Sequence, residues 1–300
     1  MSDSEQLAAL QREYRAYRLR VFLFLPLLAA AGISTFWNRY AALVLLGGAV
    51  AYQLLSLRPR QNRYTDAVVR ENLRRTICRQ LGAQEPAADG GAITEQTVRA
   101  AALIPLDERP QALRAVLGIT GEKDGLAVML CDATAAESFR LVEKGRKRVH
   151  FNCGCWVHIL LPQDTGCDWR ALDKDSVPTP IRTAFFSSRH SELEDAPWPD
   201  PALREKYVLY RPVERPEQAP SDAVCSQLRL LAGYTPGYAA VSLQGKTLDI
   251  FLRARFLARP VSLKAPPAVQ QLDFDPLPEL AYLLRLAKVL SQEASAAQPR

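Results

Sequence analysis

The sequence predicts an α+β protein, with an N-terminal two-helix transmembrane hairpin followed by a cytoplasmic mixed α+β domain with antiparallel strands. Three observations favour this fold class. Two uncharged apolar runs lie almost back to back at 21–37 and 40–57. Residues 146–161 alternate apolar and polar side chains with the two-residue period of a strand. Residues 279–290 repeat apolar side chains at helical spacing, so helices and strands are mixed along the chain.

Each apolar run is close to the roughly 20 residues that a helix needs to cross a hydrocarbon core about 30 Å thick. Only Asn38 and Arg39 separate the two runs. A cleaved signal peptide and a buried soluble hairpin are the alternatives. The long charged segment before Val21 disfavours the first, and the second run would still anchor the chain. Core helices are rarely charge-free all round, which disfavours the second alternative.

Basic residues flank the hairpin on its outer sides, whereas the turn holds Arg39 alone. Cytoplasmic flanks carry the excess of Lys and Arg, so a multi-pass protein of the inner membrane with both termini in the cytoplasm is expected. The residues expected to contact the membrane surface are Arg12, Arg15, Arg18, Arg20, Arg58, Arg60 and Arg63.

Local patterns place further elements after the hairpin. Residues 69–81 form an apolar helical stripe that Gly82 should end, and Thr94 is a candidate N-cap for a helix to about Leu103. A strand at 125–131, the stretch 138–143, a turn at Lys144-Gly145 and the alternating strand 146–161 should follow.

The C-terminal part of the chain, from residue 207 onward, also mixes helices and strands. Residues 207–210 read as a strand, and Ser221 should cap a helix that continues to Leu231 and closes at Gly233. A hairpin is expected at 239–252 with Gln244-Gly245 in its turn, so that Val241 faces Leu248 and Ala239 faces Ile250. An amphipathic helix at 279–290 should lead into a small, polar tail.

These patterns divide the chain into five expected parts. They are a basic N-terminal segment (1–20), the transmembrane hairpin (21–57), a juxtamembrane helix and linker (58–92), the cytoplasmic α+β domain (93–292) and a flexible tail (293–300).

The spacing His150-x-x-Cys153-x-Cys155-x-x-His158 invites a zinc-site interpretation. On a strand, however, the two cysteines point to one face and the two histidines to the other. Four ligands cannot converge on a tetrahedral metal from opposite faces of one strand. We therefore expect two core thiols, two exposed histidines and no metal.

Composition excludes several classes of function. The six cysteines lack the paired spacing of a disulfide framework, which fits free thiols in a reducing compartment. The net charge of +6 owes much to the juxtamembrane arginines, and no nucleic-acid reader motif accompanies it. The sequence predicts no cofactor, and no nucleophile lies beside a base in a catalytic pattern.

Three features carry a family resemblance. They are Leu193-Glu194-Asp195 ahead of the aromatic stretch 206–210, the hairpin at 239–252 and the closing helix at 279–290. In these features the chain resembles an uncharacterised bacterial membrane-protein family catalogued as domain of unknown function three-one-three-seven. It departs from the family at 211–220, where an acidic stretch and an Ala-Arg-Tyr motif are usual. The resemblance implies an inner-membrane location and transfers no catalytic residue.

Together these observations predict a membrane-anchored cytoplasmic interaction or scaffold module rather than an enzyme. Its expected partners are the lipid bilayer and another membrane or membrane-associated protein, with no nucleic acid. The alternative is a membrane-tethered enzyme acting on a lipid or peptide, which would need a cleft with converging polar groups. The sequence leaves the process and the oligomeric state open.

Overall fold

A computed structural model describes residues 3–106, 112–140, 147–175, 190–215, 219–235 and 238–297. The chain divides into two compact units. The first unit comprises residues 1–76 and 259–274, and the second comprises 77–258 and 275–300. The predicted turn at Lys144-Gly145 lies outside the described residues.

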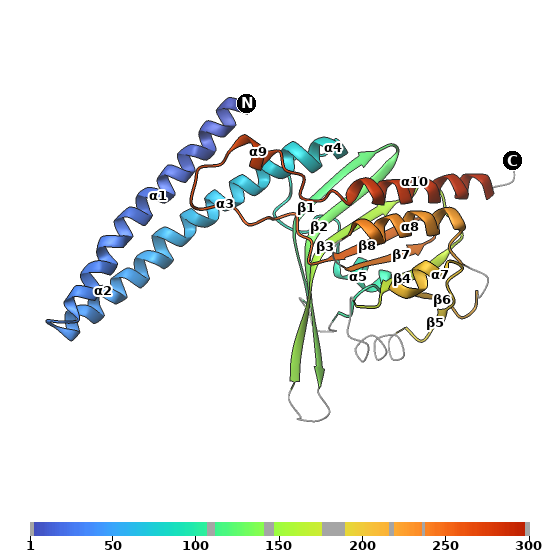
Figure 1. Cartoon of the computed structure of the whole chain (residues 1–300), viewed down its shortest axis with the longest axis horizontal. Helices are drawn as coiled ribbons and strands as arrows, with labels where there is room; N and C mark the ends of the chain where they lie inside the picture. Colours follow the sequence, from blue (N-terminus) through green and yellow to red (C-terminus); the bar gives the residue numbers. More distant parts are fainter. Residues whose placement is uncertain are drawn as a thin grey trace. The chain divides into compact units, whose positions relative to one another are not determined.

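The first unit is built on two long antiparallel helices (Figure 1). The helix α1 (Asp3–Ser34) turns back at Asn38, whose side chain accepts the backbone N–H of Tyr40 at 2.9 Å and so caps α2 (Arg39–Tyr52). The helix continues through the π-helical turn η1 (Gln53–Leu57) into α3 (Arg58–Leu73), a second π-helical turn η2 (Arg74–Cys78) and α4 (Arg79–Leu81). It ends at Gly82, as predicted, in the left-handed conformation that glycine tolerates.

The two halves of this helical pair differ in what they expose. Both helices are long and apolar enough to cross a membrane by length and composition. Between residues 19 and 55 both helices expose large apolar side chains: Leu19, Phe22, Leu23, Leu25, Leu28, Ile33, Phe36, Trp37, Tyr40, Leu43, Val44, Leu46, Val50, Leu54 and Leu55. Outside residues 19–55, the helical pair instead has a buried aromatic core.

A returning segment completes that core. Residues 259–274, which we call the strap, include the short helix α9 (Val269–Leu272). Leu272 is fully buried and packs in a cluster with Leu10, Tyr14, Tyr64 and Val68. The strap lies within the predicted α+β domain (93–292) in sequence, but its apolar side chains pack on α1 and α3.

The second unit confirms the predicted mixture of helices and antiparallel strands. Its open sheet has the strand order β1-β2-β3-β8-β7-β4-β6-β5, and every neighbouring pair is antiparallel. The strands are β1 (Leu113–Lys123), β2 (Leu126–Arg140), β3 (Lys147–Leu160), β4 (Asp168–Asp173), β5 (Leu193–Ala196), β6 (Tyr207–Pro212), β7 (Tyr238–Gln244) and β8 (Thr247–Arg253).

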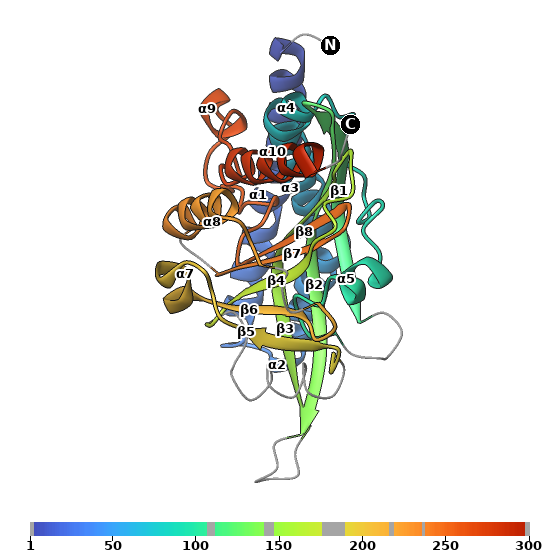
Figure 2. The same ribbon diagram turned by 90° about the vertical axis from the view of Figure 1, so that its right-hand side faces the viewer.

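Helices cover both faces of the sheet (Figures 1 and 2). They are α5 (Glu95–Ala101) on one face, α8 (Asp222–Tyr234) and α10 (Leu280–Ala297) side by side on the other, and α7 (Pro201–Lys206) ahead of β6. Thr94 and Ser221 cap α5 and α8 as predicted. Gly233 does not close α8, which runs on to Tyr234. The helix α10 extends beyond Leu290 to Ala297, and the burial of Ala294 shows that this last part is packed.

Coverage of both faces changes the interpretation of the strand at 146–161. The alternation predicted one buried and one exposed face. In β3, Cys155 and Trp156 are both fully buried although they point to opposite faces, and Asn152 is fully buried on the supposedly exposed face. The reason is the second apolar layer, formed by α5 and the residues that follow it, which packs on Trp156 and Phe251.

The predicted hairpin at 239–252 exists, but its predicted register was wrong by two residues. Gly245 and Lys246 form the two-residue turn between Gln244 and Thr247. Val241 therefore pairs with Ile250, and Ala239 pairs with Leu252. The apolar face survives this shift because moving by two residues keeps every side chain on its original face.

The close approach of β3 to β8 makes Gly154 a test of this sheet. A Cβ atom at Gly154 would lie 2.2 Å from the carbonyl oxygen of Leu252, so Gly154→Ala should lower the free energy of unfolding by at least about 2 kcal/mol. Gly233→Ala in α8 is the matched control, because a Cβ atom there meets nothing within 4 Å. That variant should be as stable as the parent or gain up to about 1 kcal/mol. Thermal unfolding in mild detergent measures both, and equal effects would contradict this packing.

Candidate functional site

The seven arginines predicted at the membrane surface all lie in the first unit. Those at 12, 15, 18, 58 and 63 are exposed, and those at 20 and 60 are half-buried. Arg20 donates from Nε to Ser56 Oγ at 3.2 Å, and an Arg60 nitrogen lies 3.6 Å from a Glu13 carboxylate oxygen. These two contacts join α1 to the second helix next to the apolar half of the pair. Contact of the seven arginines with lipid stays a prediction.

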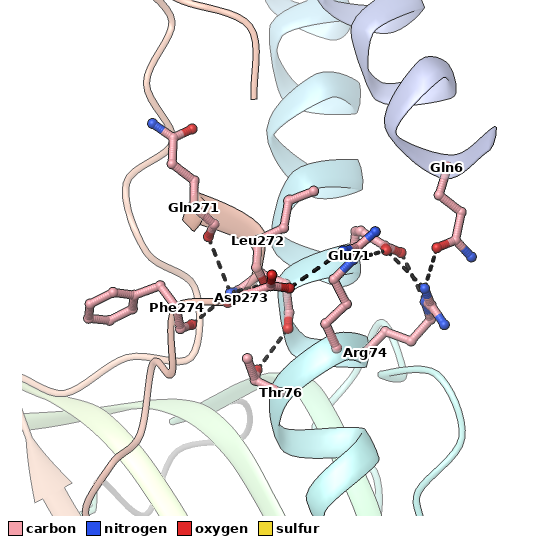
Figure 3. Close-up of polar contacts among 10 residues, drawn as sticks. Gln6, Glu71, Arg74, Thr76, Gln271, Leu272, Asp273 and Phe274 are labelled. Atoms are coloured by element: carbon pink, nitrogen blue, oxygen red, sulfur yellow. Dashed lines mark hydrogen bonds and ion pairs between the residues drawn. The ribbon is translucent and has the colours of Figure 1, made fainter. Parts of the chain in front are cut away.

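Beyond these arginines, Asn72 holds the strap against α3 by hydrogen bonds to strap residues that Figure 3 labels. Its side-chain amide nitrogen donates to the backbone carbonyls of Leu272 at 2.9 Å, Phe274 at 2.8 Å and Gln271 at 3.4 Å. Asn72 is 8% exposed, so these bonds are largely shielded from water. A buried carbonyl without a donor is costly, and Asn72 supplies the donors that the irregular strap lacks. We call this arrangement the Asn72 clasp.

A charged network borders the clasp. The Glu71 carboxylate accepts hydrogen bonds from Arg74 Nε at 2.9 Å and Arg75 Nε at 2.6 Å. Arg74 also donates to Gln6 of α1, and Arg75 lies 3.4 Å from Asp273 of the strap. Burial alone would raise the pKa of the Glu71 carboxyl, but the hydrogen bonds and positive charges of the two arginines outweigh it and hold that pKa below its ordinary value.

Next to the clasp, α3 and the strap enclose a groove of about 310 Å³. Val68, Val69 and Asn72 line it from α3. The strap contributes Arg259, Pro260, Val261, Ser262, Gln270, Gln271 and Phe274. We call this cavity the strap groove. No sequence pattern pointed to it, because its two walls lie nearly 200 residues apart.

In the second unit, buried carboxylates hold the chain on either side of the strap. Asp132 of β2 accepts the backbone N–H groups of Leu257 at 2.7 Å and Ala258 at 3.0 Å. Glu279, which is fully buried, lies 2.6 Å from an Arg255 guanidinium nitrogen. Burial raises the pKa of Asp132, and the two backbone hydrogen bonds oppose that rise. The segments before and after the strap are therefore fixed at specific points.

The structure separates the residues of the zinc-site interpretation. Cys155 is buried, whereas Cys153 is half-buried, and burial reinforced by the Asp132 carboxylate raises the pKa of the Cys155 thiol. His158 is partly buried rather than exposed, and its Nδ1 lies 2.8 Å from Asp249. The side chain of His150 lies outside the described part. Among the described side chains no group of three or more His, Cys, Asp or Glu residues could hold a metal ion.

A polar row that the sequence did not reveal crosses the sheet at His158. Register places His158, Asp249, Ser242 and Arg170 directly opposite one another on β3, β8, β7 and β4. Asp249 accepts the indole N–H of Trp156 at 2.9 Å in addition to its contact with His158. Arg170 pairs with Asp168, and burial lowers the pKa of its guanidinium. The charged members of the row pair with neighbours on the sheet, which suits a structural role.

Comparison with known proteins does not identify a family for this chain. No family model and no curated protein matches the chain, so membership of the resembling family stays a prediction. Among solved structures, the crystal structure of the mycobacterial trehalose monomycolate transport factor A, TtfA, matches with a TM-score of 0.39 and 8% sequence identity. That match covers 78% of this chain and 97% of the other.

Removing the Asn72 clasp should loosen the strap. In Asn72→Ala the three strap carbonyls lose their donor, so the free energy of local opening should fall by about 1–3 kcal/mol. Hydrogen exchange of the Gln271 and Asp273 amides, which bond within the strap, measures this opening. Asn62→Ala, at an exposed position of the same helix, should leave both amides unchanged within about 0.5 kcal/mol. Equal protection in the two variants would refute the clasp.

The Glu71 network should give stability a defined pH dependence. Because the folded pKa of Glu71 is lowered, its contribution is present above the ordinary value near 4.5 and is lost as pH falls through the lower folded value. The parent should therefore unfold at a higher temperature than Glu71→Gln at pH 6, and this gap should close in more acidic buffer. Glu205→Gln, at an exposed position of α7, is the control and should show no such gap. A gap of the same size at every pH from 6 down to 2 would contradict the assignment.

Proposed function

We propose that residues 21–57 cross the bacterial inner membrane twice and hold the α+β domain at its cytoplasmic face as an interaction or scaffold module. The observation that supports insertion is the exposed apolar surface at 19–55. A monomeric soluble protein rarely exposes a contiguous apolar patch larger than a few hundred Å². Burying each large apolar side chain stabilises a protein by roughly 1.5–3 kcal/mol, so lipid is a far better solvent for this surface than water.

The boundaries of the exposed apolar surface support the same proposal. Phe36, Trp37 and Tyr40 are more than four-fifths exposed at the turn, where an aromatic belt would lie at one interface. At the opposite end, Arg18, Arg20 and Arg58 mark the return to polar surface. The larger number of basic residues at that end supports a cytoplasmic location for both termini.

A scaffold role is favoured over catalysis by two features. On the sheet, His158 pairs with Asp249 and Arg170 pairs with Asp168, which gives these charged groups a structural role. The chain also passes between its two units three times, at 76/77, 258/259 and 274/275, where a simple tether needs one passage. We propose that the domain presents a surface to a membrane or membrane-associated protein.

Topology reporters test the membrane proposal. A fluorescent protein fused after Arg300 should fluoresce in the cytoplasm, and alkaline phosphatase inserted between Asn38 and Arg39 should be active in the periplasm. The protein should stay in the membrane fraction after carbonate washing, with an N-terminal tag retained. Val44→Arg combined with Leu43→Arg should reduce retention, because both side chains are exposed on the apolar half. Alkaline phosphatase activity from a fusion after Arg300 would overturn the orientation.

A further inference from the structure

We propose that the strap groove binds a single-chain anionic amphiphile, a long-chain fatty acid, with the chain along its apolar wall and the carboxylate at Arg259. This goes beyond membrane anchoring and does not require it. The groove belongs wholly to the first unit, since all of its lining residues lie in 68–72 or in the strap.

The walls of the groove are suited to an alkyl chain. Val68, Val69, Pro260, Val261 and Phe274 are five of the ten lining residues, and Phe274 is about half exposed. Polar groups of the lining lie among the exposed strap residues, apart from Asn72, whose amide nitrogen already donates to strap carbonyls. Small-molecule sites combine apolar side chains with placed polar groups, and this groove sets five apolar side chains beside five polar ones.

Arg259 supplies one positive charge at the groove. Its guanidinium carbon lies 4.1 Å from the centroid of the Phe274 ring, which fixes the side chain by a cation–π contact. Arg259 is exposed and has no ion-pair partner within the described residues. A guanidinium oriented in this way suits a carboxylate, which can accept two parallel hydrogen bonds from it.

Size and charge narrow the choice of occupant. A volume of about 310 Å³ lies at the lower end of the roughly 300–1,000 Å³ range for small-molecule sites. A helix docking in a groove needs anchor positions over two turns, which is more length than this lining provides. Basic residues outnumber acidic ones in both α3 and the strap, so an anion is favoured over a cation. One apolar chain with one negative head matches these features.

The Asn72 clasp makes the groove a preformed site. The strap forms most of the lining, and the clasp fixes the end of the strap that carries Gln271 and Phe274. A ligand that enters therefore pays little to order its site. Binding should in turn protect the strap from opening, because a ligand that binds only the closed form stabilises it.

Photolabelling of the full chain in phosphatidylcholine nanodiscs tests the proposal. The probes are hexadecanoic acid bearing a diazirine on its chain and the methyl ester of the same acid. The acid should label peptides that contain 68–72 or 259–274, and it should do so more strongly than the ester. Arg259→Gln should reduce labelling by the acid about tenfold and leave labelling by the ester unchanged. Arg79→Gln, which removes an exposed arginine outside the groove, should behave as the parent.

A second variant closes the groove. Val69→Trp should abolish labelling by both probes, and circular dichroism checks that its helices remain. Equal labelling by acid and ester, unchanged labelling of Arg259→Gln, or labelling confined to 21–57 would each overturn the site. Competition by phosphatidylglycerol as strong as that by unlabelled hexadecanoic acid would overturn the choice of a free fatty acid. Carbonate washing of the cell membranes from which the protein is purified reads membrane insertion separately, so failure of one proposal is distinguishable from failure of the other.

Discussion

The backbone of the strap must find hydrogen-bond donors where it packs on two helices, and Asn72 provides them. An irregular segment buried against apolar side chains is tolerated only if its carbonyls are satisfied. One amide nitrogen bonds three carbonyls around Leu272, which lets that fully buried leucine complete the core between α1 and α3. The strap groove depends on this closure, and Arg75 of the Glu71 network reaches the same strap at Asp273.

The strap also explains how the two units are connected. In the first unit it is fixed by the Asn72 clasp and by the contact of Tyr14 with the Lys264 carbonyl at 2.9 Å. In the second unit Asp132 fixes the chain that enters the strap, and Glu279 lies beside Arg255 where α10 is about to begin. Buried carboxylates are costly unless they are bonded or paired, and here their partners are backbone N–H groups and a guanidinium. Loss of either partner would leave an uncompensated charge.

In the sheet, too, buried charged groups are paired with neighbouring groups. Apolar layers on both faces make the sheet a stable platform, but they also bury His158, Asp249, Ser242 and Arg170 wholly or in part. The charged members of this row pair with neighbours. The domain therefore combines an interior whose charged groups are paired with a chain that passes three times between the two units.

The sequence by itself determined the local elements: the two apolar helices, the Gly82 stop, the Thr94 and Ser221 caps, and the antiparallel strands. Each follows from side-chain periodicity or from a cap within a few residues, so local physics is sufficient. Only the tertiary structure decided that 152–159 is buried or half-buried on both faces, that Val241 pairs with Ile250, and that residues 259–274 leave the α+β domain for the hairpin unit. The candidate site was beyond prediction for the same reason. Asn72 and Arg259 belong to the site only because segments nearly 200 residues apart meet in the fold. No local pattern encodes such contacts, because they depend on which partners the buried groups find across the whole fold.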